Sequence, residues 1–557
     1  MKFDTFVEKI FDYFKTDSNF CVSAGLDTNL GNLPDIGKNN YLKKTAKVQT
    51  LLNTIKEINP DDLNQDERID LELSGQLLLR EKTFLEMTID GELVYFKMPK
   101  AAPMIVDPLF YLFATDPREP KYRLVNVLTR IEQIPQFLSQ AQQIYQKPVE
   151  RWVKIELSQL REIPSFFDSL LGWAESTQFN GYEKLQKSIQ AANASIQKYQ
   201  TYLESASTTK NIFIGPEQTQ NVLNSAGIKL SFDELFDIAK NFNKDTFAKI
   251  DELKDIIIKK YELKAESTIE EVDEFLKAKY KVQRPVDSKG FQYVLDYYEN
   301  EASKIEAFLK DKNLFPIMDD QEMMIIQTPK FMEAVIPAGA MCPPPSFRTG
   351  NKKSIVYLTL KEELLDEHCT LSIPIMMVHE GIPGHHLQLS WAANNPSVIR
   401  KLTMANDLAE GWTTMLEDYM VDVGYISENK DEVVFLGKRD LSRLGARVAI
   451  DLYFMTGEKK YLQIVDNLTF DSEDPFVNAG KLLQYLTGFT DARVQAELNW
   501  YSQERGYPLS YLTGNHLVNN LKKKFLEQGK GDDQAFHEAY LKAGNMPVSV
   551  LEKVLLN

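Results

Sequence analysis

The chain has 557 residues, of which 43% are hydrophobic and 26% charged, the balance of a folded globular protein with a substantial core. Its formal net charge of −16 argues against a general affinity for nucleic acid or anionic lipid, because both require basic patches. The three cysteines form no CxxC pair, so neither a disulfide framework nor a thiolate zinc site is expected, and the chain suits a reducing, cytoplasmic compartment.

The first residues predict an amphipathic helix, because Phe3, Phe6, Ile10 and Tyr13 recur at helical spacing. Acidic residues interrupt this apolar pattern, so we expect no secretory signal. The sequence has no run of about 18 apolar residues, so we expect neither a transmembrane helix nor a membrane partner. The oligomeric state is left open.

Helices dominate the residues that follow. A short hairpin is expected around Asp90-Gly91, within residues 86–97. Apolar spacing then predicts helices over three segments, residues 123–146, 181–205 and 251–282.

Local motifs indicate where some of these helices begin. A capping box is a Ser or Thr followed three residues later by Glu, and it marks the start of a helix. Two are present, at Ser231–Glu234 and Thr268–Glu271, and Gly215-Pro216 predicts a turn between helices.

Strand patterns are few. Residues 354–360 alternate β-branched and aromatic side chains and predict one strand, and the proline-rich stretch 337–345 before it predicts a loop. No strand–helix alternation indicates a parallel sheet. We therefore predict a mainly α protein, a single large helical architecture over residues 1–557 with a small β element beside the active-site cleft. An N-terminal helical half (residues 1–290) would precede a C-terminal catalytic half (residues 291–557).

Three of the six histidines lie within eight residues, in the stretch His379-Glu380-Gly-Ile-Pro383-Gly-His385-His386. It resembles the zinc motif H-E-x-x-H, in which two histidines one helical turn apart bind the metal and Glu activates water. Here Pro383 occupies the place of the second histidine. In a regular helix, residues six apart are rotated by about 240° and separated by roughly 9 Å, so His379 and His385 could not share one ion.

The helix must therefore be interrupted within residues 380–384, and Pro383 with its flanking glycines supplies the means. A bulge of two residues brings His385 to the second ligand position, whereas a bulge of three brings His386. We favour His385 because its bulge is simpler, and His386 stays open as the alternative.

A third zinc ligand is expected about thirty residues downstream. Glu410 would complete a His2Glu site with an open fourth position, and Glu417, two turns further along, would hydrogen-bond a ligand histidine or have a structural role. Zn²⁺ is thus the expected cofactor, and Glu380 the expected catalytic base. The other histidines, His368, His516 and His537, lack such a context and are expected to be structural.

The stretch HEGIPGHHLQ, of the form HExxPGHH, resembles the hallmark of the DUF885 proteins, which are grouped with zinc peptidases of the gluzincin type. The resemblance covers nearly the whole chain. The segments that carry it are PAGAMCPPPSF with SIVYLTL (the family's loop and edge strand), Glu410-Gly411-Trp412 and the closing stretch AFHEAYLKAGNMPVSVLEKVL.

A further DUF885 pattern is matched in part, at Tyr501, Gly506, Tyr511 and Gly514. The chain departs from it at Trp500, Arg505, Tyr507 and Pro508. In related gluzincins a tyrosine donates a hydrogen bond to the oxyanion. The resemblance implies that role for Tyr511, with Tyr501 as the alternative.

These observations predict a zinc-dependent hydrolase, a carboxypeptidase-like enzyme or an oligopeptidase acting on peptides or small amides. The strand 354–360 would pair with an extended substrate, and Arg348, Lys352 and Lys353 nearby would bind its terminal carboxylate. The alternatives are a zinc hydrolase of a non-peptide amide or ester, and a non-catalytic binding protein that retains the fold.

Overall fold

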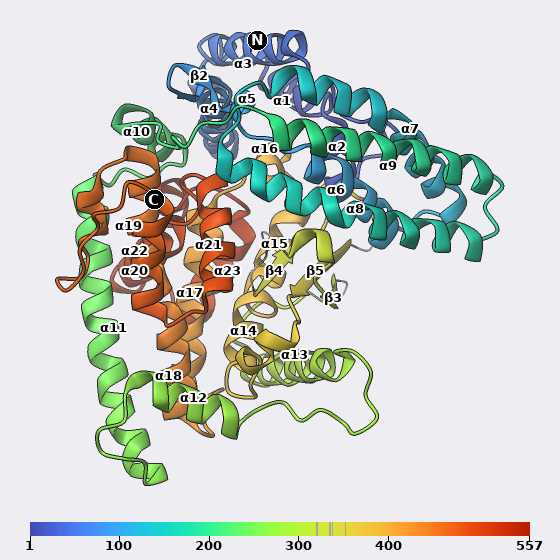
Figure 1. The fold of residues 1–557 in the computed structure, drawn as a ribbon. Helices are drawn as coiled ribbons and strands as arrows, with labels where there is room; N and C mark the ends of the chain where they lie inside the picture. Colours follow the sequence, from blue (N-terminus) through green and yellow to red (C-terminus); the bar gives the residue numbers. More distant parts are fainter. Residues whose placement is uncertain (319–320, 334–335, 337, 351, 557) are drawn as a thin grey trace.

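The computed structural model describes residues 1–318, 321–333, 336, 338–350 and 352–556, and it confirms a mainly α-helical protein (Figure 1). The helices of the first part of the chain are α1 (Phe3–Phe14), α2 (Ser18–Ser23), α3 (Lys38–Ile55), α4 (Gln65–Glu86), α5 (Val94–Lys97), α6 (Ala101–Ala114), α7 (Pro120–Ile144), α8 (Glu150–Ser176), α9 (Tyr182–Ser205), α10 (Pro216–Ser225), α11 (Phe232–Tyr261), α12 (Ile269–Lys279) and α13 (Gln292–Lys312).

The second part of the chain contributes the helices that surround the histidine cluster. They are α14 (Ile373–Glu380), α15 (His385–Asn394), α16 (Val398–Leu402), α17 (Asn406–Asp422), α18 (Lys430–Leu441), α19 (Arg443–Thr456), α20 (Pro475–Thr487), α21 (Asp491–Gln503), α22 (Ser510–Glu527), α23 (Asp533–Ala543) and α24 (Val548–Leu556). The strands are β1 (Thr88–Ile89), β2 (Glu92–Leu93), β3 (Gln321–Gln327), β4 (Gly339–Cys342) and β5 (Lys352–Leu358), and short 3₁₀ turns lie at Pro60–Asp62, Lys330–Met332, Glu362–Glu367 and Lys459–Leu462.

Most of the predicted helices are present with nearly the predicted bounds. Helix α1 buries its predicted apolar face, α7 and α9 match their segments, and α10 begins at Pro216 directly after the predicted turn. Both capping boxes form, at the starts of α11 and α12. The predicted helix 251–282 is wrong as one element: α11 ends at Tyr261, and the second capping box requires non-helical backbone at Thr268.

The predicted hairpin is present but shorter than residues 86–97. Its strands β1 and β2 pair antiparallel over two residues each, and the turn residues Asp90 and Gly91 have φ of 54° and 76°. Positive φ at both central positions is the geometry that an Asp-Gly turn favours. Helix α5 begins directly afterwards, at Val94.

A three-stranded sheet in the order β3-β5-β4 corrects the strand predictions. Strand β5 is the predicted strand, but it is central, parallel to β3 on one side and antiparallel to β4 on the other. The parallel partner β3 was not predicted, and β4 lies inside the stretch 337–345, which was expected to be a loop. Strand β4 escapes prediction because it is short and lacks β-branched and aromatic residues. Its first residue must be small, since a Cβ on Gly339 would lie 2.8 Å from the carbonyl oxygen of Tyr357.

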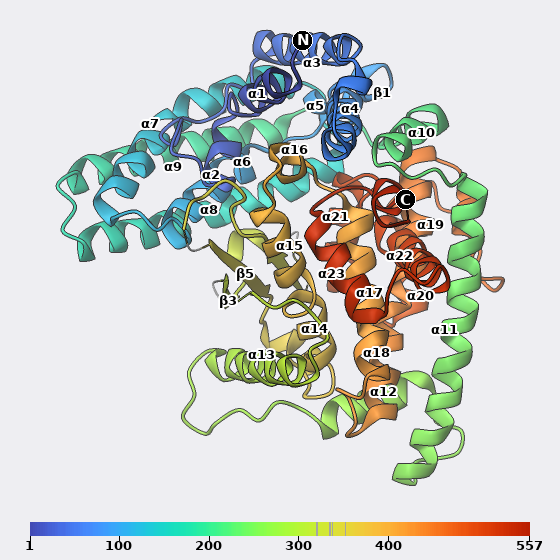
Figure 2. The same cartoon turned by 180° about the vertical axis from the view of Figure 1, so that it is seen from behind.

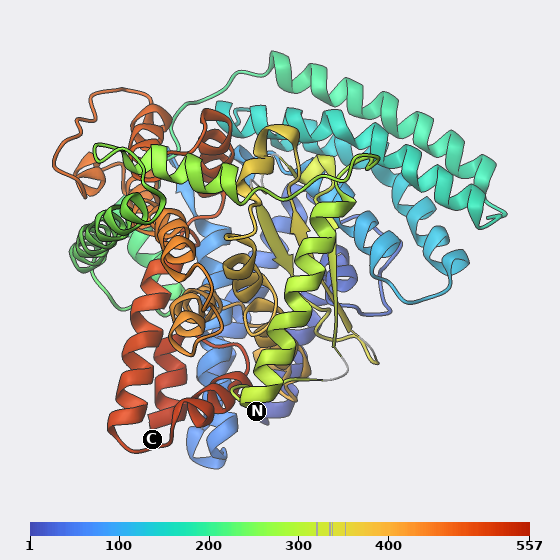
Figure 3. The same cartoon turned by 90° about the horizontal axis from the view of Figure 1, so that it is seen from below.

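The elements form a helical body around the histidine cluster. Helices α7, α8 and α9 lie side by side at one end, and α11 runs along the opposite flank against α18 and α19 (Figures 1 and 2). Viewed from below, α13 crosses the molecule beside the sheet (Figure 3). The packing of α11 against α18 and α19 crosses the predicted boundary at residue 290, and the division into two halves stays a prediction.

Helices α17 and α22 pack closely at two glycines. A Cβ on Gly411 would lie 2.5 Å from the backbone of Gly514, and one on Gly514 would lie 2.2 Å from the carbonyl oxygen of Asp407. The two backbones therefore touch without an intervening side chain. Among the helices of the described residues, none has the length and apolar character needed to cross a membrane.

Candidate metal centre

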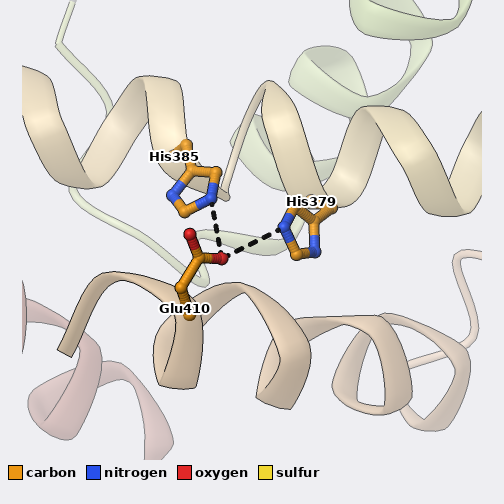
Figure 4. A group of neighbouring side chains, drawn as sticks. All are labelled: His379, His385 and Glu410. Carbon is orange, nitrogen blue, oxygen red and sulfur yellow. Dashed lines mark ion pairs between the residues drawn. The ribbon is translucent and has the colours of Figure 1, made fainter. Parts of the chain in front are cut away.

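The helix that carries the histidine cluster is interrupted where the sequence predicts it. Helix α14 ends at Glu380, α15 begins at His385, and the backbone between them is non-helical, with ψ of −126° at Gly381 and −134° at Gly384. The Ile382–Pro383 peptide bond in this turn is cis. The interruption brings His379 and His385 to the same side of the two consecutive helices, facing α17 (Figure 4).

Close backbone packing and one hydrogen bond hold this turn. A Cβ on Gly384 would lie 2.0 Å from the carbonyl oxygen of His379, so a larger residue would require the backbone to move. The indole Nε1 of Trp412 donates to the carbonyl oxygen of Pro383 at 2.9 Å. Helix α17 therefore supplies both Glu410 and the hydrogen bond that satisfies the carbonyl oxygen of Pro383 in the turn.

Three buried side chains converge at this point. Oε2 of Glu410 lies 3.6 Å from Nε2 of His379 and 3.2 Å from Nε2 of His385 (Figure 4). The three potential ligand atoms all lie within 4.8 Å of one another. Ligand atoms of a tetrahedral zinc, with bonds of about 2.0–2.1 Å, stand about 3.3 Å apart, so the spacing fits such an ion.

Hydrogen bonding around the cluster leaves electron pairs that point inward. Nδ1 of His379 lies 2.8 Å from Oε1 of Glu417, which as a carboxylate accepts the ring proton and leaves the Nε2 lone pair toward Glu410. Oε2 of Glu410 is buried and has no hydrogen-bond partner among the described residues. A buried carboxylate facing two imidazole nitrogens is a donor set that fits zinc.

The pKa values of Glu410 and His379 indicate that the cluster favours a bound positive charge. Burial opposes ionisation of Glu410, but the adjacent His385 and His379 hold its pKa below its usual range. Burial also lowers the pKa of His379, yet the adjacent carboxylates of Glu410 and Glu417 outweigh that effect and raise the pKa to about 10. The two carboxylates thus favour a cation between them, which a proton or a metal ion would supply.

The structure places His385, not the alternative His386, in the cluster. Nδ1 of His386 lies 2.5 Å from Oγ of Ser354 on β5, and His386 is not part of the cluster. Burial lowers the pKa of His386 to about 4, which keeps its ring neutral at physiological pH. The structure therefore brings the favoured histidine, His385, beside His379, although the interruption spans the four residues between α14 and α15 instead of a two-residue bulge.

A cavity of about 1200 Å³ opens beside the cluster, and His379, Glu380, Glu417 and Tyr511 are on its wall. Glu380 is the last residue of α14, next in the chain to a candidate ligand, and its Oε2 is buried with no hydrogen-bond partner among the described residues. This carboxylate is placed to take up a proton inside the cavity.

Three tyrosines near the cluster, Tyr501, Tyr507 and Tyr511, make different contacts. The Tyr511 ring stacks on His379, with centroids 6.4 Å apart, whereas Tyr501 is fully buried and its hydroxyl accepts a bond from Arg447. Tyr507, one of the departures from the DUF885 pattern, donates to Oε1 of Glu410 at 2.8 Å. Sequence reasoning missed this contact, because the residue was read only as a departure from the pattern.

The basic residues predicted to bind a carboxylate lie elsewhere. Arg348 donates to the carbonyl oxygen of Thr115, Lys352 to that of Ala393, and Lys353 pairs with Glu322. None of the three is among the described residues that line the cavity. Instead the cavity wall carries an arginine cluster on α18, α19 and α21, which the sequence analysis did not identify. Its signal was present as the helical spacing of Arg439, Arg443 and Arg447.

The remaining histidines have partners outside the cluster. His368 lies on the cavity wall with Nδ1 2.8 Å from the hydroxyl of Tyr298, and His516 contacts Asn520. His537 is fully buried, with its ring stacked on Phe315 and Nδ1 3.1 Å from the carbonyl oxygen of Leu314. The structural role expected for His516 and His537 agrees with these contacts, while His368 also faces the cavity.

Comparisons with known proteins place this fold. A family model described as "Bacterial protein of unknown function (DUF885)" matches residues 20–555. A "putative lipoprotein" from Colwellia psychrerythraea has a TM-score of 0.78 at 17% identity, covering 100% of this chain and 98% of its own. A "putative lipoprotein of unknown function" from Shewanella oneidensis has a TM-score of 0.75 at 18% identity, covering 100% of both chains. These likenesses show a shared fold, and no curated protein matches.

Proposed function

The chain belongs to the DUF885 family, and from the geometry of its site we propose that it is a zinc-dependent hydrolase of amide bonds, a peptidase of the gluzincin type. The observation that carries the proposal is the convergence of His379, His385 and Glu410, all buried, beside Glu380 on a large cavity, where Oε2 of Glu380 has no hydrogen-bond partner among the described residues. Such a donor set with one open position is the arrangement of catalytic rather than structural zinc sites.

His379, His385 and Glu410 would hold the ion, and Glu417 would fix the His379 ring through the bond at Nδ1. Zinc in such a site supplies Lewis-acid chemistry, polarising a carbonyl group and making water a stronger acid. Tyr507 would hold the Glu410 carboxylate from its outer side.

Two residues would handle protons and developing charge. Glu380 would accept a proton from the attacking water at Oε2 and pass it to the nitrogen of the leaving amine. Tyr511 would donate a hydrogen bond to the oxygen of the tetrahedral intermediate. Burial and the neighbouring Glu410 hold the pKa of Tyr511 well above its usual range, so the hydroxyl keeps the proton that this role requires.

An extended peptide would bind along β4, not along β5. Strand β5 already has hydrogen-bonded neighbours on both sides, whereas β4 is an edge of the sheet. Gly339 and Ala340 of β4 line the cavity, and a free strand edge offers backbone groups to an added strand. This arrangement supports a peptide substrate over a small ester.

The test combines metal analysis with cleavage of a peptide library. We expect one zinc per chain in protein purified without chelator, and cleavage by the unchanged protein. Glu380→Gln should keep the zinc and abolish turnover, because Glu380 is assigned as the base and not as a ligand. Failure to bind added zinc would overturn the proposal, and cleavage confined to esters or small amides would replace the peptidase assignment with the alternative hydrolase.

A further inference from the structure

A network of arginines forms one wall of the cavity. Arg443 pairs with Asp440, Arg493 lies 3.4 Å from the same carboxylate, and Arg493 and Arg447 lie 4.0 and 3.1 Å from Glu497. All five residues line the cavity. They come from the end of α18, the first half of α19 and the first half of α21, and the fold brings α21 to the two consecutive helices α18 and α19.

The network buries positive charge. The Asp440 side chain is 44% exposed, whereas the side chains of the three arginines are only 7–14% exposed. Nη1 of Arg447 is buried and has no hydrogen-bond partner among the described residues. Burial and repulsion from Arg447 lower the pKa of Arg443 to about 10, although it stays charged at neutral pH. A buried guanidinium donor without an acceptor is costly, and a bound anion would supply that acceptor.

The network lies close to the candidate metal ligands. Cζ of Arg447 lies 4.2 Å from the centroid of the Tyr511 ring, and that centroid lies 6.4 Å from the centroid of His379. These two steps together equal the length of about three extended residues, since each adds about 3.3–3.6 Å. A substrate group at the arginines would therefore lie within about three extended residues of a carbonyl at the metal.

We propose that Arg443, Arg447 and Arg493 form a subsite that binds a carboxylate of the substrate, within about three residues of the cleaved bond. The inference rests on the proposed function, and it adds the class of substrate: an anionic peptide, with the carboxylate at its C-terminus or on an acidic side chain. Guanidinium groups suit this ligand because their planar donors match both oxygens of a carboxylate. The subsite takes the role that the sequence assigned to Arg348, Lys352 and Lys353.

Binding of matched peptides tests the proposal without relying on turnover. The probes are N-acetyl-Ala-Ala-Phe with a free carboxylate, the same peptide as its C-terminal amide, and the amide of N-acetyl-Ala-Glu-Phe. Affinities are measured by calorimetry on the Glu380→Gln protein as purified, alone and with Arg443→Gln added. Arg443 is chosen because, among the described residues, its guanidinium hydrogen-bonds and pairs with Asp440 alone, whereas removal of Arg447 would also break the bonds to Glu497 and Tyr501.

We expect at least one of the two anionic peptides to bind about tenfold to a hundredfold more tightly than the neutral amide, the worth of a charge-assisted hydrogen bond. Arg443→Gln should remove most of this preference, and Arg443→Lys should restore part of it. The acid and the glutamyl amide identify which carboxylate is bound. Arg161→Gln on α8, where the side chain is 64% exposed and is not among the described residues that line the cavity, should leave the preference unchanged.

Equal affinity of the parent for all three peptides would overturn the proposal. A preference for anionic peptides that is unchanged in Arg443→Gln would also overturn it, because direct binding of the carboxylate to a metal would then explain the preference. Because the parent comparison needs no arginine variant, misfolding of Arg443→Gln would leave Arg443→Lys and the parent to decide. The two proposals can also fail independently. Hydrolysis without a preference for carboxylates would refute only the subsite, whereas a preference for carboxylates without zinc binding or hydrolysis would refute only the proposed enzymatic function.

Discussion

The hydroxyl of Tyr507 donates a hydrogen bond to Oε1 of Glu410 at 2.8 Å, so the other oxygen of that carboxylate is the one that faces His379 and His385. A carboxylate held in this way presents one oxygen to an ion instead of two. The contact also fixes the rotation of a ligand side chain before any ion binds, which reduces the entropy lost on binding.

Tyr507→Phe is therefore expected to weaken zinc binding by about 10–100-fold, the usual effect of removing a group that orients a ligand. The affinity is measured by competition with a chromophoric chelator. Tyr202→Phe is the matched control, because the Tyr202 hydroxyl donates to the carbonyl oxygen of Tyr145, away from the site. Equal zinc affinity in Tyr507→Phe and the parent would contradict the role of this bond.

Glu410→Ala should lower zinc affinity more than Glu417→Ala does. Glu410 would contribute a ligand atom, whereas Glu417 acts through the Nδ1 proton of His379 and its loss should cost about 10–100-fold. The same competition assay ranks the two variants. The opposite ranking would make Glu417 the ligand and Glu410 the orienting group.

Tyr511→Phe should lower kcat by about 10²–10³-fold while the zinc content stays the same, because only a donor to the oxyanion is lost. Steady-state kinetics on a cleaved peptide, with metal analysis of the same sample, measure both quantities. Tyr501→Phe is the informative comparison, since its hydroxyl contacts Arg447 rather than the cavity. A larger loss of kcat in Tyr501→Phe than in Tyr511→Phe would transfer the role to Tyr501.

Gly384→Ala should disrupt the interrupted helix. The added Cβ would lie 2.0 Å from the carbonyl oxygen of His379, so the turn must open and His385 must move away from His379. We expect lower zinc affinity and a free energy of unfolding reduced by about 1–3 kcal/mol, measured by urea denaturation. Gly172→Ala is the control: it lies within α8 with open space around it and should raise stability by about 0.5–1 kcal/mol. Unchanged zinc affinity in Gly384→Ala would refute this account of the turn.

His537 predicts a pH dependence of stability away from the site. Burial lowers the pKa of His537 to about 4, so the folded protein takes up this proton at lower pH than the unfolded chain, whose histidine pKa is about 6.5. The unfolded state therefore binds more protons between about pH 6.5 and 4, and stability falls as pH decreases through that range. At pH 5 the loss relative to pH 7 should be about 2 kcal/mol from this group.

His537→Gln isolates this contribution, because the other titrating groups cancel when variant and parent are compared. The difference in free energy of unfolding between the two proteins should shrink or reverse by about 2 kcal/mol from pH 7 to pH 5. Urea denaturation at the two pH values measures it. A difference that is the same at both pH values would show that His537 titrates normally in the folded protein.

The sequence was informative where local chemistry decides structure. Capping boxes, apolar spacing and the Pro383-Gly384 break each act within a few residues, so the starts of α11 and α12 and the interruption between Glu380 and His385 could be predicted. Helix dimensions required the interruption, and the preference for a simpler bulge favoured His385 over His386, which is the histidine that lies beside His379 and Glu410.

What could not be predicted depends on residues far apart in the chain. Strand β4 is defined by its neighbour β5 and not by its own composition, and whether β5 lies at an edge depends on β3, about thirty residues earlier. The arginine cluster exists only because α21 packs beside α18 and α19. The predicted carboxylate-binding residues were chosen for nearness in the sequence, and the fold directs them to other partners.

The contact between Gly411 and Gly514 fixes the spacing between α17 and α22, and with it the distance between residues of the candidate site on the two helices. Glu410 precedes the first glycine, and Tyr511 lies one turn before the second, so the candidate ligand and the candidate oxyanion donor are registered by backbone against backbone. Where side chains separate two helices, repacking of the core can shift their spacing by fractions of an ångström. At Gly411 and Gly514 no side chain separates the two helices, so no substitution of such a side chain can change their spacing. The surrounding core can therefore vary in sequence while the distance between Glu410 and Tyr511 stays constant.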